Sequence, residues 1–578
     1  MNEIKTDVLI LGSGGAGLFA ALHVYDYNPS LEVVLATKGL IGKCGCSRMV
    51  QGGLNVVLNP ADSVEKHFMD TIKGGGFIND QELAYTLVSD APKAVHEMEV
   101  KVGCYFDRAE DGTIHQKAFA GQSFDRTVHV ADLSGIQIVA RLTDQIFRRQ
   151  DRIKVLEETR GLDLLTTGEG DRVVGAVMAD MRTGEFIVVN AKVVIVATGG
   201  ASSMYKIAAP SFDKTGDGMA MCFRAGAVFM DMEMMQFHPT GLLAGQSRLS
   251  GSVLEEGLRG AGGYLINGLG ERFMERYDPE RMERSTRDRV ARAGYMEIMA
   301  GRGTESGGVY LVMSHLGPEF VEKKFPGMCD RVKDIGKDLA REPVEISPTS
   351  HFMMGGVKID PDCRSINMKG LVVSGEDSSG VHGANRLGGN GICESTTFGR
   401  RAGDTAAAIA EQEVLRPYRQ EQVEEIRRRW TKFFRRTEGV DIYPIRDEIK
   451  NLMWEKVGVV REGKKLQEAM ARLDELLEMA DQAYVANRTL SRYNMEWNDI
   501  LNTINWITVA RMVSKSASLR TESRGSHYRS DFTGTDNENW LVNIYLKNKG
   551  DMEIESFMKP VNATRFSIEE IQKANLKY

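Results

Sequence analysis

The sequence predicts an α/β protein of several domains, in which one parallel-sheet domain is interrupted by an insertion. Length is the first observation, because 578 residues are more than one hydrophobic core supports. The second is the N-terminal stretch DVLILGSGGAGLFAALHVYDY, which reads as a buried strand, a glycine turn and a helix. The third is KGLVVSGE at 369–376, where strand-then-loop character returns after a long segment of a different kind.

The order of the segments predicts where the domains begin and end. Two further strands, LEVVLATKG and AKVVIVATGG (191–200), follow the first helix. Mixed segments rich in Arg and Gly then suggest an inserted α+β domain. Later stretches such as KKLQEAMARLDELLEMADQA are charged and helix-periodic, and the tail holds short strand-like pieces such as NWLVNIYL. We therefore predict domains at 1–235, 236–344, 345–410, 411–515 and 516–578, with the first and third forming one unit.

Composition excludes several classes of function. The net charge of −7 does not favour a nucleic-acid partner. No apolar run reaches the roughly 18 residues of a membrane span, and MNEIKTDVLILG enters a strand too early for a signal peptide, which favours a cytoplasmic protein. The seven cysteines include no C-x-x-C pair, so we expect no metal cluster in this chain. A disulfide between Cys44 and Cys46 would close a very small ring and is not expected.

The glycine turn has the spacing of a dinucleotide site. Gly12, Gly14 and Gly17 form G-x-G-x-x-G between the first strand and helix, with Ser13, Gly15 and Ala16 completing the turn. The first glycine makes the turn, the second admits a pyrophosphate, and the third lets the helix pack on the strand. The positive end of the helix favours the negative charge of the phosphates. Taken alone the motif could be an ordinary glycine-rich turn, and its position between strand and helix favours the dinucleotide.

The end of the second strand favours FAD over NAD. The residue expected to bind the ribose is usually acidic, but this strand ends in Thr37 and Lys38. Glu376, at the end of the late SGED strand, suits a second contact to the cofactor, as in flavoproteins with a split nucleotide domain. The other residues that we expect to line the cofactor site are Gly39, Cys46, Ser47, Gln51, Gly52, Gly53, Thr198, Gly199, Asp217, Gly391 and Ile392.

Five motifs in order make the chain similar to a known family: MMQFHPTG (234–241), RGAGGYLINGLGERFMERY (259–277), SHFMMGG (350–356), VHGANRLGGNG (381–391) and RTESRGSHYRSDF (520–532). Together they closely resemble the flavoprotein subunit of succinate dehydrogenase and fumarate reductase. The resemblance implies a split Rossmann-like FAD-binding domain with an inserted α+β capping domain, followed by a helical domain and a small C-terminal domain. L-aspartate oxidase and adenylylsulfate reductase share much of the pattern, while FAGQS (119–123) is more similar to the succinate/fumarate branch.

The resemblance also implies the reaction, which adds or removes two hydrogens across the central bond of a C4-dicarboxylate. His351, Arg386 and His238 match family positions that bind the substrate carboxylates, and Phe119 matches an aromatic residue near the substrate. Taken alone, each arginine would be an ordinary ion-pair residue and each histidine a satisfied core residue.

The resemblance implies that Arg287 transfers the proton to the substrate and that Glu256 and Arg259 form its proton relay. A relay is needed because an isolated arginine, with a pKa of about 12.5 or more, holds its proton tightly. The spacing of three residues between Glu256 and Arg259 would place both on one helical turn.

Two positions depart from the family pattern. Much of the family carries FAD covalently on a histidine before the Gln-Gly-Gly turn, and this position falls on Cys46. We expect non-covalent FAD, with a thioether to Cys46 as the lesser alternative. Without the covalent link the flavin potential would be lower, which would favour fumarate reduction over succinate oxidation. Glu255 stands where the family usually has Thr or Ser, and a carboxylate there would repel the substrate unless it is protonated or paired with a cation.

The resemblance implies an iron–sulfur partner subunit, with or without a membrane anchor or another electron-transfer subunit that would bring this chain to the cytoplasmic face of a membrane. A relative that uses oxygen, or a thiol- or quinol-linked complex, stays open. The alternative from another class is a decayed flavin-binding scaffold or redox sensor. Retention of the five residues Glu256, Arg259, Arg287, His351 and Arg386 argues against decay.

Overall fold

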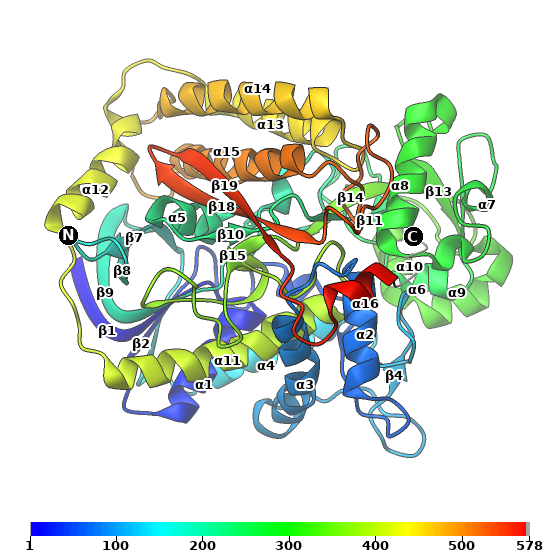
Figure 1. Ribbon diagram of the computed structural model, residues 1–578, viewed down its shortest axis with the longest axis horizontal. Coiled ribbons are helices and arrows are strands. Elements are labelled where there is room, and N and C mark those ends of the chain that lie inside the picture. Colours follow the sequence, from blue (N-terminus) through cyan, green and yellow to red (C-terminus); the bar gives the residue numbers. More distant parts are fainter. Residues whose placement is uncertain (1, 490, 574–578) are drawn as a thin grey trace.

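The computed structural model describes residues 2–489 and 491–573, and its centre is a seven-stranded sheet (Figure 1). Its strands are β1 (Asn2–Leu11), β2 (Val33–Ala36), β6 (Ile153–Leu156), β7 (Thr159–Thr166), β8 (Val173–Asp180), β9 (Glu185–Val196) and β16 (Leu371–Val373). β1 pairs in parallel with β2 and β9, and β16 pairs in parallel with β9. The strand that follows the insertion therefore completes the sheet begun before it, which confirms the predicted split α/β domain.

Helices α1 (Gly15–Tyr27), α4 (Ser134–Phe147) and α11 (Asn390–Gln412) lie together on one side of this sheet (Figure 1). α1 and α11 pack closely because α11 presents glycines to α1. A Cβ atom at Gly399 would lie 2.6 Å from the Ala16 carbonyl oxygen, and one at Gly403 would lie 2.5 Å from that of Ala20. The two helices therefore run parallel, and α1 begins at the carboxyl end of β1.

The inserted segment builds a second layer with its own hydrophobic core of residues from 242 to 346. Its sheet is antiparallel, in the order β11 (Met235–Leu242), β14 (Val344–Met353), β13 (Val309–Val312) and β12 (Tyr264–Ile266). Its helices are α6 (Gly257–Gly260), α7 (Met274–Tyr277), α8 (Arg287–Glu297), α9 (Pro318–Lys324) and α10 (Pro326–Lys333), at the right of Figure 1. β11 and β14 run from the main body into this layer and join the two.

Four helices cover the other side of the molecule: α12 (Gln420–Arg435), α13 (Ile442–Lys456), α14 (Gly463–Asp481) and α15 (Met495–Leu519) (Figure 1). α14 has an exposed charged face, whereas α15 is buried on nearly all sides from Trp497 to Ala517. α15 therefore acts as a core helix, between α13 and α14 on one side and the main body on the other.

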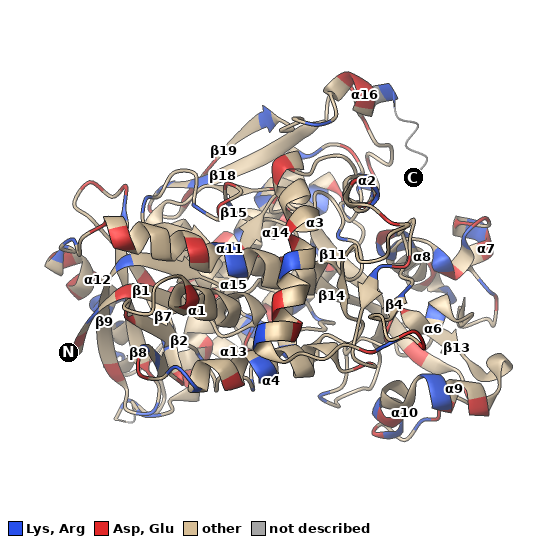
Figure 2. Ribbon diagram, turned by 90° about the horizontal axis from the view of Figure 1, so that it is seen from below, with Lys and Arg blue, Asp and Glu red and all other residues tan. Residues whose placement is uncertain are grey.

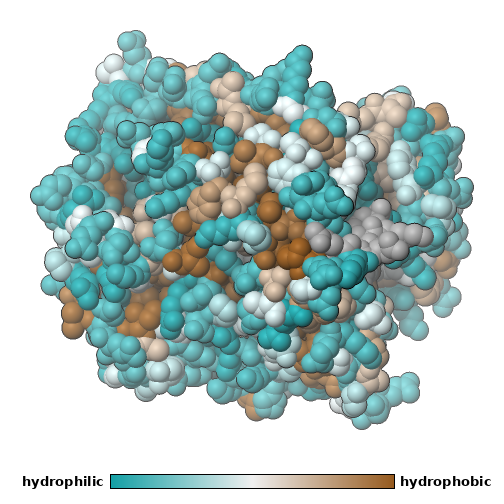
Figure 3. Space-filling view, in the orientation of Figure 1, coloured by the Kyte–Doolittle hydropathy of each residue, from teal (hydrophilic) through white to brown (hydrophobic). Residues whose placement is uncertain are grey.

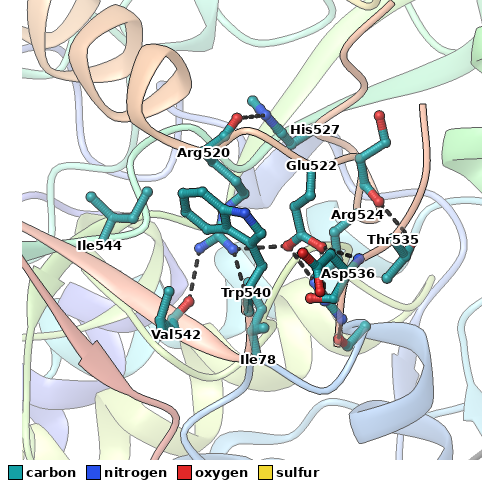
Figure 4. A network of polar contacts seen from close by, with 12 residues as sticks. Ile78, Arg520, Glu522, Arg524, His527, Thr535, Asp536, Trp540, Val542 and Ile544 are labelled. Atoms are coloured by element: carbon teal, nitrogen blue, oxygen red, sulfur yellow. Dashed lines mark hydrogen bonds and ion pairs between the residues drawn. The ribbon is translucent and has the colours of Figure 1, made fainter. Parts of the chain in front are cut away.

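The C-terminal segment returns across the molecule as the hairpin of β18 (Val542–Gly550) and β19 (Glu553–Pro560) (Figure 1). β18 pairs with β10 (Phe229–Met230), which joins the hairpin to β15 (Gly356–Lys358) and β17 (Ser378–Ser379). Apolar side chains gather near the middle of this face (Figure 3). The buried ion pair of Arg520 with Glu233 ties the segment before the hairpin to the core, and a second pair with Glu522 lies within that segment (Figure 4).

Smaller elements complete the body: α2 (Val64–Gly74), α3 (Gln81–Glu97), α5 (Asp217–Ala225), α16 (Ile568–Lys573) and the three-stranded sheet of β3 (Leu54–Asn55), β5 (Thr127–Val128) and β4 (Gln116–Lys117). Acidic and basic residues are interspersed over the face in Figure 2. None of the described helices has the length and apolar character to cross a membrane.

Candidate active site

A cavity of about 760 Å³ lies where the central sheet meets the inserted layer. Of the residues predicted for the cofactor and substrate, all except Gly17 and Arg259 line its wall. The cofactor set on the wall is Gly12, Ser13, Gly14, Gly15, Ala16, Thr37, Lys38, Gly39, Cys46, Ser47, Gln51, Gly52, Gly53, Thr198, Gly199, Asp217, Glu376, Gly391 and Ile392, and the substrate set is Phe119, His238, Glu255, Glu256, Arg287, His351 and Arg386. Motifs separated by hundreds of residues thus meet in one space.

The glycine turn has the conformation that its spacing predicts. Gly12 has a φ of 110°, and a Cβ atom there would lie 2.1 Å from the Ala197 carbonyl oxygen. A Cβ atom at Gly17 would lie 1.9 Å from the Gly12 carbonyl oxygen, so Gly17 serves helix packing rather than the cavity wall. The Gly15 amide donates to the Ser47 hydroxyl at 3.0 Å. The N-termini of α1 and α11 both reach the cavity wall, which suits an anionic phosphate group.

Lys38, which follows β2, has its side chain bound by other residues of the protein. Its ammonium donates to Asp217 at 3.0 Å, to Thr215 at 2.7 Å and to Asn502 of α15 at 2.8 Å. Burial opposes ionisation of Asp217, but Arg160 and Lys38 outweigh burial and lower the pKa of this carboxyl. The Lys38 side chain therefore forms a fixed wall, and Thr37, which accepts from Ser13 at 2.8 Å, lies beside it.

Glu376 also has protein partners, an ion pair with Lys214 at 2.5 Å and the Met353 amide at 2.9 Å. The amides of Thr198 and Gly199 both donate to Asp377, and burial raises the pKa of Asp377 to about 7. Asp377, after β16, thus holds Thr198 and Gly199 at the end of β9, and Glu376 is held by Lys214 and the Met353 amide.

The segment before the Gln-Gly-Gly turn brings two thiols to the cavity wall. Cys46 and Cys44 are free cysteines, and Cys44 Sγ lies 3.5 Å from the Thr37 hydroxyl. Burial raises the pKa of the Cys46 thiol, with Lys214 acting in the opposite direction. Cys46 is therefore a neutral thiol at neutral pH.

At the end of the cavity under the inserted layer lies the cavity arginine cluster, which we define as Arg259, Arg287 and Arg386 with Glu256. Arg287 Nε donates to Glu256 Oε2 at 2.7 Å, and Arg287 Nη2 lies 2.6 Å from the same oxygen. Arg259 Nη2 lies 3.5 Å from Glu256 Oε1. Arg259 is buried behind the wall, so it reaches the cavity through Glu256 and not directly.

Arg386 approaches the cluster from the loop before α11. Arg386 Nη2 donates to Gln236 Oε1 at 3.0 Å, and Arg287 Nη1 lies 3.5 Å from the same oxygen. The Arg386 guanidinium stacks on the Phe352 ring at 4.4 Å, and its Nε is buried without a hydrogen-bond partner among the described residues. Burial lowers the pKa of Arg386 to about 9, and Arg287 adds to this effect, so Arg386 is still charged at neutral pH.

The charges of this cluster do not balance. Burial opposes ionisation of Glu256, but Arg287 and Arg259 outweigh it and lower the pKa of Glu256, which is therefore a carboxylate. Within the cluster, one carboxylate faces three guanidinium groups, an excess of two positive charges, and Glu283, Glu376 and Glu394 act on the cluster only without a direct ion pair. Since uncompensated buried charge is costly, the cluster is suited to a ligand with two negative charges.

The two histidines of the cavity add hydrogen bonds and no charge. His238 on β11 and His351 on β14 have ring centroids 5.4 Å apart. Burial lowers the pKa of both well below the usual range, and the neighbouring arginines add to it. His238 Nδ1 lies 3.1 Å from the Thr240 hydroxyl, which holds the ring in place. Both rings are neutral at neutral pH.

Three polar residues of the site were missed by the sequence analysis. Gln236 holds Arg287 and Arg386 together, and its place inside MMQFHPTG was the available signal. Arg331 of α10 lines the cavity and donates to the Val253 carbonyl at 2.7 Å; with the Gln51 amide turned so that its oxygen faces Arg331, that oxygen accepts from Arg331 Nη2 at 2.8 Å. Arg160 lies behind the wall and pairs with Asp217 at 2.6 Å. Neither arginine belongs to a motif, so no sequence signal pointed to them.

Comparison with known proteins decides the family. Residues 7–392 match the family described as FAD binding domain, and residues 446–577 match the fumarate reductase flavoprotein C-terminal family. The chain belongs to the succinate dehydrogenase and fumarate reductase flavoprotein family. It is a FAD-dependent oxidoreductase, as the motifs predicted.

Relatives of this chain extend over its whole length. One subunit of the fumarate reductase (CoM/CoB) of Methanothermobacter marburgensis is 42% identical over 94% of this chain and 97% of its own. The flavoprotein of Escherichia coli quinol fumarate reductase, solved as a point variant, superposes with a TM-score of 0.92 at 32% identity over 98% of both chains. L-aspartate oxidase of Vibrio cholerae is 34% identical over 92% of this chain and 96% of its own.

The residues of the cavity wall fit FAD, the cofactor of this family. Among the described residues of the wall, ten are Lys or Arg and five are Asp or Glu, an excess of positive charge that suits a diphosphate and an acidic substrate together. Gly12 to Ala16 and the α11 N-terminus line the cavity, where their backbone amides could bind the phosphates.

Proposed function

We propose that this chain interconverts fumarate and succinate at the cavity arginine cluster. The observation that carries the proposal is the excess of two positive charges around Glu256, which a C4-dicarboxylate dianion would balance. Arg386 binds one carboxylate through its unpartnered Nε and its Nη groups, and the neutral His238 and His351 add hydrogen bonds. The printed name of the Methanothermobacter relative, a fumarate reductase, supports the same substrate.

Arg287 is the proton donor in this proposal. Its Nε and Nη2 are bound to Glu256, whereas Nη1 has the long 3.5 Å contact with Gln236 and is the nitrogen that can donate to a substrate carbon. Glu256, a carboxylate at rest, then takes a proton from Arg259 behind the wall and passes it to Arg287 over 2.6 Å, and Arg259 regains its proton from solvent. The relay replaces the proton as soon as Arg287 gives it up, and it is needed because an isolated arginine holds its proton too tightly to donate it to carbon.

FAD, when bound, supplies the hydride that the other carbon of fumarate receives. The electrons come from a partner, and we propose an iron–sulfur subunit, with or without a membrane-anchor or other electron-transfer subunit. The name of the Methanothermobacter relative, one subunit of a fumarate reductase, supports a partner subunit in general. We further propose that FAD is bound without a covalent link and that fumarate reduction is the favoured direction, because a neutral Cys46 thiol replaces the attachment residue of the family. Acid precipitation of the protein should leave the flavin in the supernatant.

Anaerobic stopped-flow mixing tests the function. The dithionite-reduced holoprotein is mixed with fumarate, and flavin absorbance is followed. We expect rapid reoxidation by fumarate, with succinate as the product. Failure of fumarate to reoxidise the flavin would overturn the proposal. Formation of iminoaspartate from L-aspartate in the presence of oxygen would instead assign the aspartate oxidase activity of the Vibrio relative.

A further inference from the structure

Glu255 is the one acidic residue of the substrate end that has no role in the proton relay. It precedes Glu256 and the short helix α6, is 7% exposed and lines the cavity. Its Oε2 atom is buried without a hydrogen-bond partner among the described residues. A buried carboxyl oxygen without a partner is costly unless a ligand completes its hydrogen bonding.

The cations near Glu255 form no ion pair with it among the described residues. Arg287 and Arg259 pair with Glu256. Arg331 donates to the Val253 carbonyl and to the Gln51 side chain. Lys117 lies 5.8 Å from the centre of the Phe119 ring. Glu255 therefore lacks the fixed ion pair that would hold it as a carboxylate.

The charged groups that face Glu255 come from four parts of the fold. They are Lys117 of β4, Asp132 of the segment before α4, Glu256 of its own segment and Arg331 of α10. Burial raises the pKa of Glu255, and Asp132 and Glu256 raise it further, against the opposite effects of Lys117 and Arg331. A bound dianion would add negative charge to the same cavity and strengthen this preference for the neutral form.

We propose that Glu255 binds the dicarboxylate as a neutral acid, donating its proton in a hydrogen bond to one substrate carboxylate. This inference rests on the proposed function, because it concerns the same dianion in the same cavity. No bond forms or breaks; the proton stays on Glu255 while the substrate is bound. Glu255 thus becomes a determinant of specificity, since it accepts a carboxylate only when it carries a proton.

A pH dependence of affinity follows from this role. At pH values below the pKa of Glu255 in the free enzyme, the acid is already protonated and KM does not change with pH. Above that pKa each binding event must take up one proton, so KM for fumarate rises about tenfold per pH unit. The chemical step does not involve Glu255, so kcat should not follow this dependence.

Glu255→Gln tests the inference, because an amide donates a hydrogen bond at every pH and carries no charge. KM and kcat for fumarate are measured with the holoprotein between about pH 5 and pH 8, the range in which a raised carboxyl pKa is visible. We expect KM of the parent protein to rise with pH and KM of the variant to stay level. Asp132→Asn is the matched control, since Asp132 faces the same arginine but does not line the cavity; it should keep the rise in KM, shifted to lower pH because Asp132 raises the pKa of Glu255.

Two results would overturn the inference. A KM that is level in the parent protein and raised tenfold or more in Glu255→Gln at every pH would show that Glu255 acts as a carboxylate. An identical pH profile in both proteins would show that Glu255 does not contact the substrate. If the variant does not fold, calorimetry of succinate binding to the parent protein in two buffers of different ionisation enthalpy decides: uptake of a proton at the higher pH supports the inference, and no uptake contradicts it. Absence of fumarate turnover at any pH would instead overturn the proposed function.

Discussion

The arginines of the C-terminal segment and those of the cavity are equally buried, but their partners differ. In the C-terminal network, Arg520 donates to Glu233 at 2.7 Å and to Glu522 at 3.0 Å, and Figure 4 shows the contact with Glu522. Arg524 donates to both oxygens of Glu522, at 2.7 and 2.9 Å, and to the Gly76 carbonyl at 2.8 Å. These guanidinium groups face carboxylates and carbonyls of their own chain, as stable buried ion pairs require.

The cavity arginine cluster is incomplete by comparison. Arg287 and Arg259 share the single carboxylate Glu256, and Arg386 has an amide, a carbonyl and an aromatic ring as its contacts. Burial of an arginine alone therefore does not indicate its role. A network in which each buried arginine has a carboxylate partner stabilises the fold, whereas a buried cluster with excess positive charge is suited to binding an anionic ligand.

The largest expected effect is on catalysis, in Arg287→Ala. Loss of the proton donor should lower kcat for fumarate by about 100- to 10,000-fold. Bound flavin and the melting temperature should change little, because Arg287 is not part of a complete structural network. Arg289→Ala is the matched control on the same helix, since Arg289 pairs with Asp278 away from the cavity. A comparable loss of activity in both variants would contradict the assignment of Arg287.

The next effect is on stability, in Glu522→Ala. This change leaves Arg520 and Arg524 without a shared buried carboxylate and should cost about 3–5 kcal/mol of folding free energy. Thermal melting of the holoprotein should show a much lower midpoint, while kcat of the remaining folded protein is retained. An unchanged melting midpoint with a loss of kcat would contradict the claim that the C-terminal arginines stabilise the fold while the cavity arginines serve the substrate.

Arg386→Lys should affect affinity more than rate. Lysine keeps the charge but lacks the planar fork that contacts Gln236 and stacks on Phe352. We expect KM for fumarate to rise by about 10- to 100-fold, with a smaller change in kcat. Steady-state kinetics with a reduced viologen dye as electron donor measures both. A KM equal to that of the parent protein would show that Arg386 does not bind the carboxylate.

The smallest effect is expected for an exposed arginine, Arg472→Ala on α14. Arg472 contacts Glu448 at 2.6 Å, but the two side chains are 36% and 41% exposed. Such pairs contribute less than about 1 kcal/mol, so the melting midpoint and KM should match the parent protein. A large drop in the midpoint would show that burial is not what separates these arginines.

The fold was predictable because its signals are local and ordered. The glycine turn between Leu11 and Gly15 and the late strand at 371–373 identified the split sheet, which the pairing of β16 with β9 confirms. The assignment of the cavity residues depended on motifs rather than on periodicity. Phe119 belongs to the short FAGQS segment, outside the five longer motifs, and it also lines the cavity.

Other parts of the site depend on contacts that no local pattern encodes. Asn502 of α15 comes from far along the chain to hold Lys38, so the ammonium is committed to the protein. Arg331 approaches Gln51 across the cavity from α10. Arg259 lies behind the wall because the turn of α6 directs it away from the cavity. Sequence spacing fixes which residues share a helical turn, but tertiary packing decides which of them face a ligand.

The central claim is that the cavity arginine cluster is built for a dianion. The most direct test compares fumarate with its monomethyl ester, which has nearly the same shape but one negative charge, as oxidants of the dithionite-reduced holoprotein. We predict that fumarate reoxidises the flavin at least about 100-fold faster at limiting concentration, because the ester leaves one buried positive charge unpaired. Equal rates for the two compounds would contradict the claim.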